Sequence, residues 1–143
     1  MIPHLDAPAA EVHLPPEVAH LATARAFVGA IAATAPGFDP GRIDDVRLAV
    51  SEAVANAIAA QGRVGSSEPV VVRSAPVGGR LVVEVVDHGG GMVAPDGGTV
   101  EVADLPEGGL GIPLLRALAD EVTLDDSPGG TAVRMAFALG RSE

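Results

Sequence analysis

The chain of 143 residues contains no cysteine, tryptophan, tyrosine or lysine. Without cysteine, neither a disulfide framework nor a thiolate metal site is possible, and the absence is typical of a reducing compartment. All nine basic residues are arginines scattered along the chain, against nineteen acidic residues, which gives a formal net charge of −10. A phosphate backbone is bound by clustered basic side chains, so this charge balance argues against a direct nucleic-acid partner.

Membrane and leader signals are also missing. The first sixteen residues, MIPHLDAPAAEVHLPP, lack the basic and apolar regions of a signal peptide. The Ala-rich stretch 19–35 is interrupted by Arg25 and is unsuited to spanning a membrane. With 48% hydrophobic residues the chain can bury one sizeable core. We expect a cytoplasmic protein with a flexible tail at residues 1–9 and one domain at residues 10–140.

Two helices are expected in the first half of the chain. The first covers about 17–35, between Pro15-Pro16 and Pro36-Gly37. The second covers 43–61, where apolar residues recur at steps of three and four, and we expect Gly62 to end it.

The second half reads mainly as strands. Residues 70–74 and 80–86 form one predicted hairpin, and 121–125 and 131–139 form another around the turn 127–130. A long loop at 87–109 and a helix at 110–120 lie between them. This order predicts an α+β fold: a two-layer sandwich whose mixed, mostly antiparallel sheet is covered on one face by helices.

Glu52 and Asn56 bring the first candidate chemistry. They lie four residues apart on the second helix and therefore share one face, where a carboxylate and an amide oxygen could act on one metal-bound ligand. A solvated polar face is the alternative interpretation of the same spacing.

Asp87 ends an apolar strand in VVDHGGGM and is followed by Gly89 and Gly91. A carboxylate at a strand end can accept a hydrogen bond from an exocyclic amine, and glycines let a flat ring approach the backbone. An ordinary glycine-rich turn would have the same composition.

A second glycine cluster, Gly108, Gly109 and Gly111, precedes the helix at 110–120. Unpaired amides at a helix start and the positive end of its dipole favour a phosphate, and Pro113 is tolerated in a first turn. A flexible loop is again the alternative. Thr131 follows the tight turn in SPGGTAV, at the start of the last strand. An ordinary hairpin without a binding function is the alternative interpretation of this motif.

The order of these four elements resembles the nucleotide-binding fold shared by gyrase, Hsp90, histidine kinases and MutL, the GHKL or Bergerat ATPases. Within that superfamily, AVSEAVANAI and EGGLGIPLLRALADEV are similar to segments of the bacterial anti-sigma-factor serine/threonine kinases. The resemblance covers nearly all of residues 10–140 and implies that ATP and Mg²⁺ are the cofactors.

The resemblance also implies roles for individual residues. Glu52 matches the acidic residue that orients or deprotonates the attacking hydroxyl, and Asn56 matches the Mg²⁺ ligand. Asp87 matches the aspartate that reads the adenine amino group. Arg25 lies roughly where the family contacts the sigma factor and its antagonist, although a solubilising arginine is the alternative. The other residues that match the family's nucleotide-binding segments are Gly89, Gly91, Met92, Gly108, Gly109, Leu110, Gly111 and Thr131.

Two departures from the family pattern bear on turnover. Ala60 stands where family members often carry a basic residue or histidine, which predicts a missing phosphate contact. The segment between Asp87 and Gly109 contains acidic residues and no basic one, so it offers no cation to the γ-phosphate.

The resemblance implies an anti-sigma regulator that sequesters a sigma factor and phosphorylates a serine or threonine of an anti-anti-sigma protein of the STAS type, acting as a homodimer. The alternative is a non-catalytic module with the same fold and a nucleotide-gated partner surface. The ATPase half of a histidine kinase fits less well, because no helix pair with a phosphoacceptor histidine precedes the domain. The four histidines show no metal-ligand spacing, and we expect them to face solvent.

Overall fold

The computed structural model describes residues 2, 5, 10–89, 98–101, 112–127 and 129–138. The strands are β1 (Ala10–Leu14), β2 (Val70–Val77), β3 (Arg80–Val86), β4 (Gly98–Glu101), β5 (Glu121–Ser127) and β6 (Gly130–Ala138). The helices are η1 (Val18–His20), α1 (Leu21–Thr34), η2 (Pro40–Arg42), α2 (Ile43–Val64) and α3 (Ile112–Leu118).

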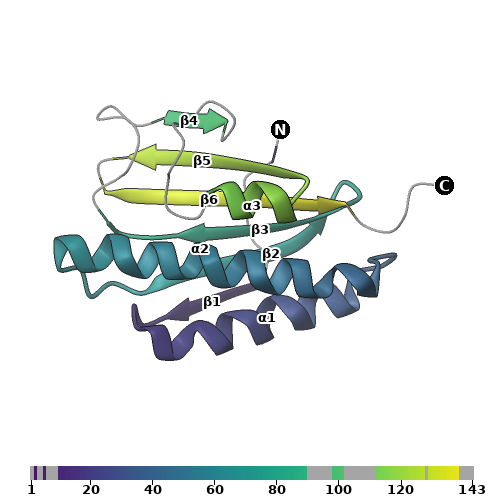
Figure 1. Ribbon diagram of the computed structural model, residues 1–143, viewed down its shortest axis with the longest axis horizontal. Coiled ribbons are helices and arrows are strands. Elements are labelled where there is room, and N and C mark those ends of the chain that lie inside the picture. Colours follow the sequence, from purple (N-terminus) through teal and green to yellow (C-terminus); the bar gives the residue numbers. More distant parts are fainter. Residues whose placement is uncertain are drawn as a thin grey trace.

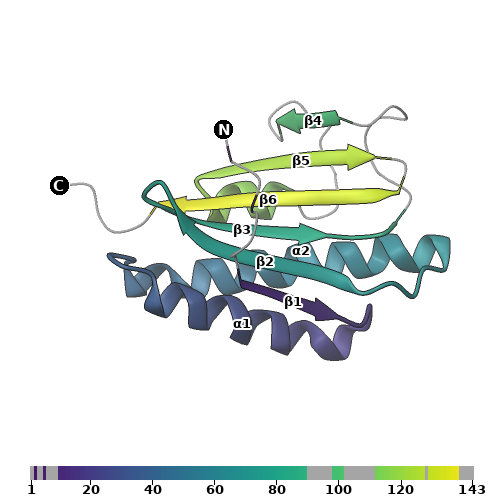
Figure 2. The same ribbon diagram turned by 180° about the vertical axis from the view of Figure 1, so that it is seen from behind.

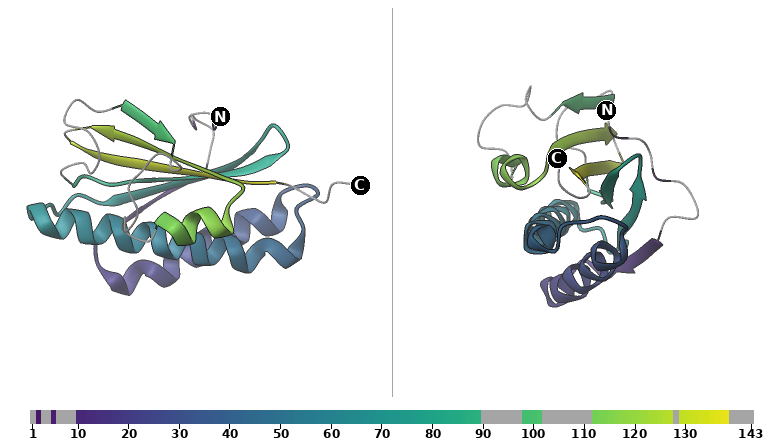
Figure 3. Two further views of the ribbon diagram at one scale, coloured as in Figure 1. Left: turned by 45° about the horizontal axis from the view of Figure 1, so that its top comes forward. Right: turned by 90° about the vertical axis from the view of Figure 1, so that its right-hand side faces the viewer.

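One sheet and one helical layer make up the described fold (Figures 1 and 3). The strands lie in the order β1-β2-β3-β6-β5-β4, and each printed pairing is antiparallel. Helices α1, α2 and α3 cover the same face, as the view from behind makes clear (Figure 2). The predicted α+β sandwich is therefore confirmed, with no parallel pairing among the described strands.

The alternation of side chains along the strands separates the two faces of the sheet. Val83, Val85 and Met135 point to the helices and belong to the main hydrophobic core, together with Val50 and Val54 of α2. Residues paired across antiparallel strands share a face, so the neighbours of these core residues in sequence point the other way. We call the side without helices the outer face.

Helix α2 is longer than the sequence predicted. It continues through Gly62 to Val64, and Gly65 ends it in the left-handed conformation with φ of 69°. The amide of Gly65 donates to the carbonyls of Gln61 and Gly62. The prediction that Gly62 ends the helix was wrong, because a glycine inside a helix is tolerated at modest cost and the chain turns only where a positive φ is needed.

Two strands were missing from the prediction. Strand β1 is an edge strand of five residues that pairs with β2. Strand β4 has four residues, pairs with β5, and lies inside the segment expected to be a loop. The predicted first hairpin is confirmed, with Gly78 and Gly79 at φ of 58° and 82° in its two-residue turn.

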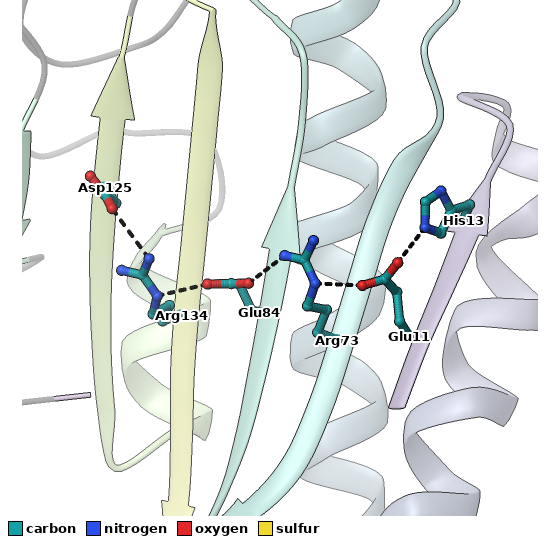
Figure 4. Close-up of polar contacts among 6 residues, drawn as sticks. All are labelled: Glu11, His13, Arg73, Glu84, Asp125 and Arg134. Carbon is teal, nitrogen blue, oxygen red and sulfur yellow. Dashed lines mark hydrogen bonds and ion pairs between the residues drawn. The ribbon is translucent and has the colours of Figure 1, made fainter. Parts of the chain in front are cut away.

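The outer face carries a row of alternating charges on β1, β2, β3, β6 and β5 (Figure 4). Arg73 donates to Glu11 at 2.6 Å and to Glu84 at 2.8 Å. Arg134 donates to the other oxygen of Glu84 at 2.8 Å and to Asp125 at 3.2 Å. Glu84 is only 1% exposed, so its two arginine partners compensate the cost of burying its charge.

The outer face also has a small apolar cluster. Ile2 and Leu5, which fall in the segment expected to be a flexible tail, are 5% and 6% exposed and cluster with Val82 and Ala136. Among the residues that the structure describes, no helix has the length and apolar character needed to cross a membrane.

Candidate functional site

Asp87 lies where β3 ends, on the face that the helices cover. It is 7% exposed, and its Oδ1 accepts a hydrogen bond of 2.8 Å from the amide of Gly89. Its own amide donates to the carbonyl of Thr131 at 2.9 Å. The carboxylate is thus a buried hydrogen-bonding group in a turn whose backbone is already fixed, as a group that reads a base edge needs to be.

Strand β6 meets this turn as the neighbour of β3 in the sheet. Thr131 is 2% exposed and continues the register that pairs β3 with β6, so it lies opposite Asp87 on the same face. At Gly130 a Cβ atom would come within 2.0 Å of the carbonyl oxygen of Asp87. The glycine is required by this close approach of two backbones.

Helix α2 places Glu52 and Asn56 in line with the turn. Glu52, Asn56 and Ala60 follow at steps of four residues, and the first two are half-buried. The turn contacts this line at Ala60, because a Cβ at Gly89 would lie 2.8 Å from the Cβ of Ala60. With a rise of 1.5 Å per residue, Asn56 is about 6 Å and Glu52 about 12 Å further along the helix.

The contact with Gly89 explains the small residue at position 60. Ala60 is 7% exposed and faces the turn that follows Asp87. A side chain at position 89 would press against Ala60, so the turn can approach α2 this closely only with glycine at position 89. The alanine, which the sequence analysis treated only as a lost phosphate contact, therefore has a packing role in this chain.

Gln61 is a residue of the site that the sequence analysis missed. It is fully buried, and it bonds to the residue directly after Asp87: its Oε1 accepts from the amide of His88 at 2.9 Å. Its Nε2 donates to the carbonyl of Glu68 at 2.6 Å. A single polar residue at the end of an amphipathic helix gives no signal in one sequence, because such residues usually face solvent.

Arg25 connects the first helix to the candidate catalytic segment. Its guanidinium donates to Oγ of Ser51 at 3.1 Å, and Ser51 directly precedes Glu52. The arginine is half-buried. It therefore has a defined contact with α2 as well as some exposed surface.

Six of the expected nucleotide-binding residues lie outside the described residues: Gly91, Met92, Gly108, Gly109, Leu110 and Gly111. Helix α3, which follows four of them in sequence, is described from Ile112.

Arg42 ties the end of α3 to the start of α2. It donates to the carbonyl of Leu118 at 2.7 Å and to Asp120 at 3.1 Å, and its guanidinium lies 5.7 Å from the ring centre of Phe137. Asp120 also accepts from the amide of Ala138 at 2.6 Å. Burial opposes ionisation of Asp120, but the bonds from Ala138 and Arg42 outweigh it and lower the pKa of the carboxyl.

A cavity of about 390 Å³ opens at this end of the sheet. It is lined by Val86, Asp87, His88, Asp125, Gly129, Gly130, Thr131 and Ala132. Val86, Ala132 and Asp125 are paired with one another in register and lie on the outer face, so the lining combines both faces of the sheet. The cavity reaches Asp87 and Thr131 but does not include the half-buried residues of α2.

Metal binding by protein groups alone finds no support in the part of the chain that the structure describes, where no three His, Asp or Glu side chains cluster. His13 and His88 are exposed as expected, and His20 is half-buried. Asn56 could still contribute one oxygen to a Mg²⁺ ion whose other ligands are phosphates and water, which is the usual arrangement for this metal.

Comparison with known proteins gives one consistent result. Residues 14–137 match the family model described as histidine kinase-like ATPase domain. The serine-protein kinase RsbW of Bacillus pumilus is 34% identical over 71% of this chain and 68% of its own length. RsbW of Bacillus velezensis is 29% identical over 91% and 86%.

Solved structures show the same fold. A crystal structure of the RsbU and RsbW domains of a Mycobacterium tuberculosis protein superimposes with a TM-score of 0.69 at 24% identity. The match covers 94% of this chain and 32% of the solved chain, so this chain spans about a third of that protein's solved length. The histidine kinase domain of a blue-light activated kinase from Erythrobacter litoralis gives a TM-score of 0.53 at 22% identity.

Proposed function

Because the chain belongs to the histidine kinase-like ATPase domain family and is related within it to the RsbW serine-protein kinases, we propose that it binds Mg²⁺-ATP and acts as an anti-sigma protein kinase. In this proposal it sequesters a sigma factor and phosphorylates a serine or threonine of a STAS-type anti-anti-sigma protein. It would do so in the cytoplasm and as a homodimer.

The observation that carries the proposal is the line of residues along α2. Asp87 is fixed against the end of the helix, Asn56 lies about one turn before that contact, and Glu52 lies about one turn before Asn56. Adenine, phosphates and attacking hydroxyl follow one another in the same order in a kinase complex. The spacing supports a nucleotide that lies along α2 with its base at Asp87.

Each residue then has a defined task. Asp87 accepts a hydrogen bond from the adenine amine, and Asn56 supplies an oxygen to Mg²⁺. When bound, the ion neutralises charge that develops on the phosphate oxygens. Glu52 accepts the proton of the substrate hydroxyl while the hydroxyl oxygen forms a bond to the γ-phosphorus. The bond from that phosphorus to the β–γ bridging oxygen breaks, and ADP leaves with the electron pair.

Phosphotransfer tests the catalytic half of this proposal. Incubation of the protein with γ-labelled ATP and a STAS-type antagonist should label the antagonist. Glu52→Ala should lower the rate by at least about a hundredfold, the usual contribution of a general base, and leave the ATP affinity within about threefold. Asp44→Ala, which removes a carboxylate that is 93% exposed at the start of the same helix, serves as the control and should retain most activity.

Equal rates for Glu52→Ala and the parent would remove Glu52 from its role. ATP binding without phosphotransfer by the parent would favour a nucleotide-gated binding module. The sequence feature that favours this second candidate is the acidic segment between Asp87 and Gly109, which offers no basic residue for the γ-phosphate.

A further inference from the structure

Gln61 connects three segments that are distant in sequence. Its side chain is fully buried at the end of α2, and both ends of its amide are bonded. Nε2 donates to the carbonyl of Glu68, just before β2, and Oε1 accepts from the amide of His88, just after β3. A buried amide with both ends satisfied is costly to replace, since removing it leaves a donor and an acceptor without partners.

The backbone of Gln61 is held as firmly as its side chain. Its carbonyl accepts from the amide of Gly65, which ends the helix, and from the amide of Ser66 at 2.9 Å. The starting point of the side chain is therefore fixed by the helix end, and the position of Oε1 follows from it.

The end of α2 consequently contacts two successive residues after Asp87. Gln61 holds the amide of His88, and Ala60 packs against Gly89. Gly89 in turn donates from its amide to Oδ1 of Asp87. The direction of the Asp87 carboxylate thus depends on the turn that Gln61 and Ala60 hold in place.

We propose that Gln61 is a positioning residue for base recognition: through the His88 amide it sets the direction in which Asp87 presents its carboxylate to the adenine amine. The inference rests on the proposed nucleotide function and adds a specificity determinant outside the groups that touch ATP. Hydrogen bonds weaken steeply with misalignment, so a small rotation of Asp87 lowers affinity for an amine-bearing base and leaves phosphate contacts unchanged.

The test compares ATP with inosine triphosphate, whose base lacks the amine that Asp87 would accept from. Calorimetry on the full chain with Mg²⁺ should show that the parent prefers ATP by about tenfold or more, the value of one hydrogen bond to a charged group. Gln61→Met keeps the length of the side chain but loses both hydrogen bonds. It should weaken ATP binding by about tenfold and leave inosine triphosphate binding within about twofold.

The matched control is Ser74→Ala. Ser74 is 1% exposed and donates one buried hydrogen bond to the carbonyl of Val82, on β3 but away from Asp87. This variant should keep the preference of the parent for ATP even where its unfolding temperature falls, because general loosening of the fold weakens both nucleotides alike.

Gln61→Glu provides the conservative rescue. In the neutral form that burial favours, it retains an oxygen that accepts from the His88 amide and an O–H that donates to the carbonyl of Glu68, so its preference for ATP should stay within about threefold of the parent's although burial of a carboxyl lowers stability. Where Gln61→Met does not fold, Gln61→Asn takes its place: its side chain is one methylene shorter and cannot hold the His88 amide in the same position, so a lost preference for ATP supports the inference and a parent-like preference overturns it.

The remaining outcomes separate the two proposals. Parent-like selectivity in Gln61→Met, or equal weakening of both nucleotides, overturns the role of Gln61 and leaves the nucleotide site intact. A parent protein that binds neither nucleotide overturns the proposed function, and the inference with it.

Discussion

At the scale of single residues, Gly130 tolerates the least change of the described glycines. A Cβ at this position would lie 2.0 Å from the carbonyl oxygen of Asp87, and its φ is 153°. Gly130→Ala should therefore push β6 away from the turn, destabilise the protein by about 2 kcal/mol and weaken ATP binding. Urea unfolding and calorimetry measure the two effects.

Gly129→Ala is the control for this prediction, since a Cβ there would meet no atom within 4 Å. It should leave the stability of the protein unchanged. Gly130→Ala with the stability and affinity of the parent would show that the backbones of β6 and the turn are not held as closely as described.

The residues proposed to touch the nucleotide could be named from the sequence, whereas the residues that support them could not. Glu52, Asn56 and Asp87 could be named because their motifs follow one another in the order found in the family that the chain resembles. The structure brings Asp87 to the end of the helix that carries the other two. Gln61 and the packing role of Ala60 could not be found, because each depends on contacts with residues more than 25 positions away. A helical period indicates which face is polar, but not which polar group is buried.

At the scale of elements, the contact between α3 and the start of α2 depends on a few polar groups. Arg42 reaches Leu118 and Asp120 just at and after the end of α3, and Asp120 also accepts from β6. Helix α3 has only seven residues. A helix this short is held by its tertiary contacts, so the Arg42 contact fixes one end of the segment that follows the glycine cluster.

Asp120→Asn should weaken this connection in a pH-dependent way. The pKa of Asp120 is lowered in the folded protein, so its contribution is present above the unfolded value of about 4 and is lost as the pH falls through the lower folded value. Because the side chain is 47% exposed, we expect a loss of only about 1 kcal/mol at pH 7. Urea unfolding from pH 7 to pH 3 should show the two proteins converging below pH about 4.

Asp45→Asn is the matched control, because Asp45 contacts the same Arg42 at 3.4 Å and is 44% exposed, but bonds no strand. It should cost clearly less. A constant difference between Asp120→Asn and the parent across the whole pH range would mean that the ionised form of Asp120 is not what holds the contact.

Elements were predictable where local pattern and packing agree. The helical period of α2 matches the face that the structure buries, and the continuous β-branched runs match strands β2 and β3, which are largely buried on both faces. Strands β1 and β4 were missed because they are short and their pairing partners, β2 and β5, lie far from them or beyond a glycine-rich segment. The end of α2 was misplaced because a single glycine does not show by itself whether the chain turns there.

At the scale of the whole molecule, the two faces of the sheet carry charged groups with different roles: structural ion pairs on the outer face and the proposed site on the helix-covered face. The charged side chains of the row on the outer face bind one another across five strands (Figure 4). The proposed site lies on the other face, against the end of α2. In the sequence Glu84 merely interrupts an apolar strand, and its place in this row emerges only when β2, β3 and β6 are aligned.

The central claim is that the helix-covered face carries an ATP site in which Asp87 accepts a hydrogen bond from the adenine amine. Calorimetric titration of the parent, Asp87→Asn and Asp45→Asn with Mg²⁺-ATP tests it most directly. Asp45 lies in the first turn of α2, is 44% exposed and is not among the residues that line the cavity at Asp87, which makes it a suitable control aspartate. We predict Mg²⁺-dependent binding by the parent and by Asp45→Asn, and at least about tenfold weaker binding by Asp87→Asn. No binding by the parent, or equal binding by all three, would contradict the account.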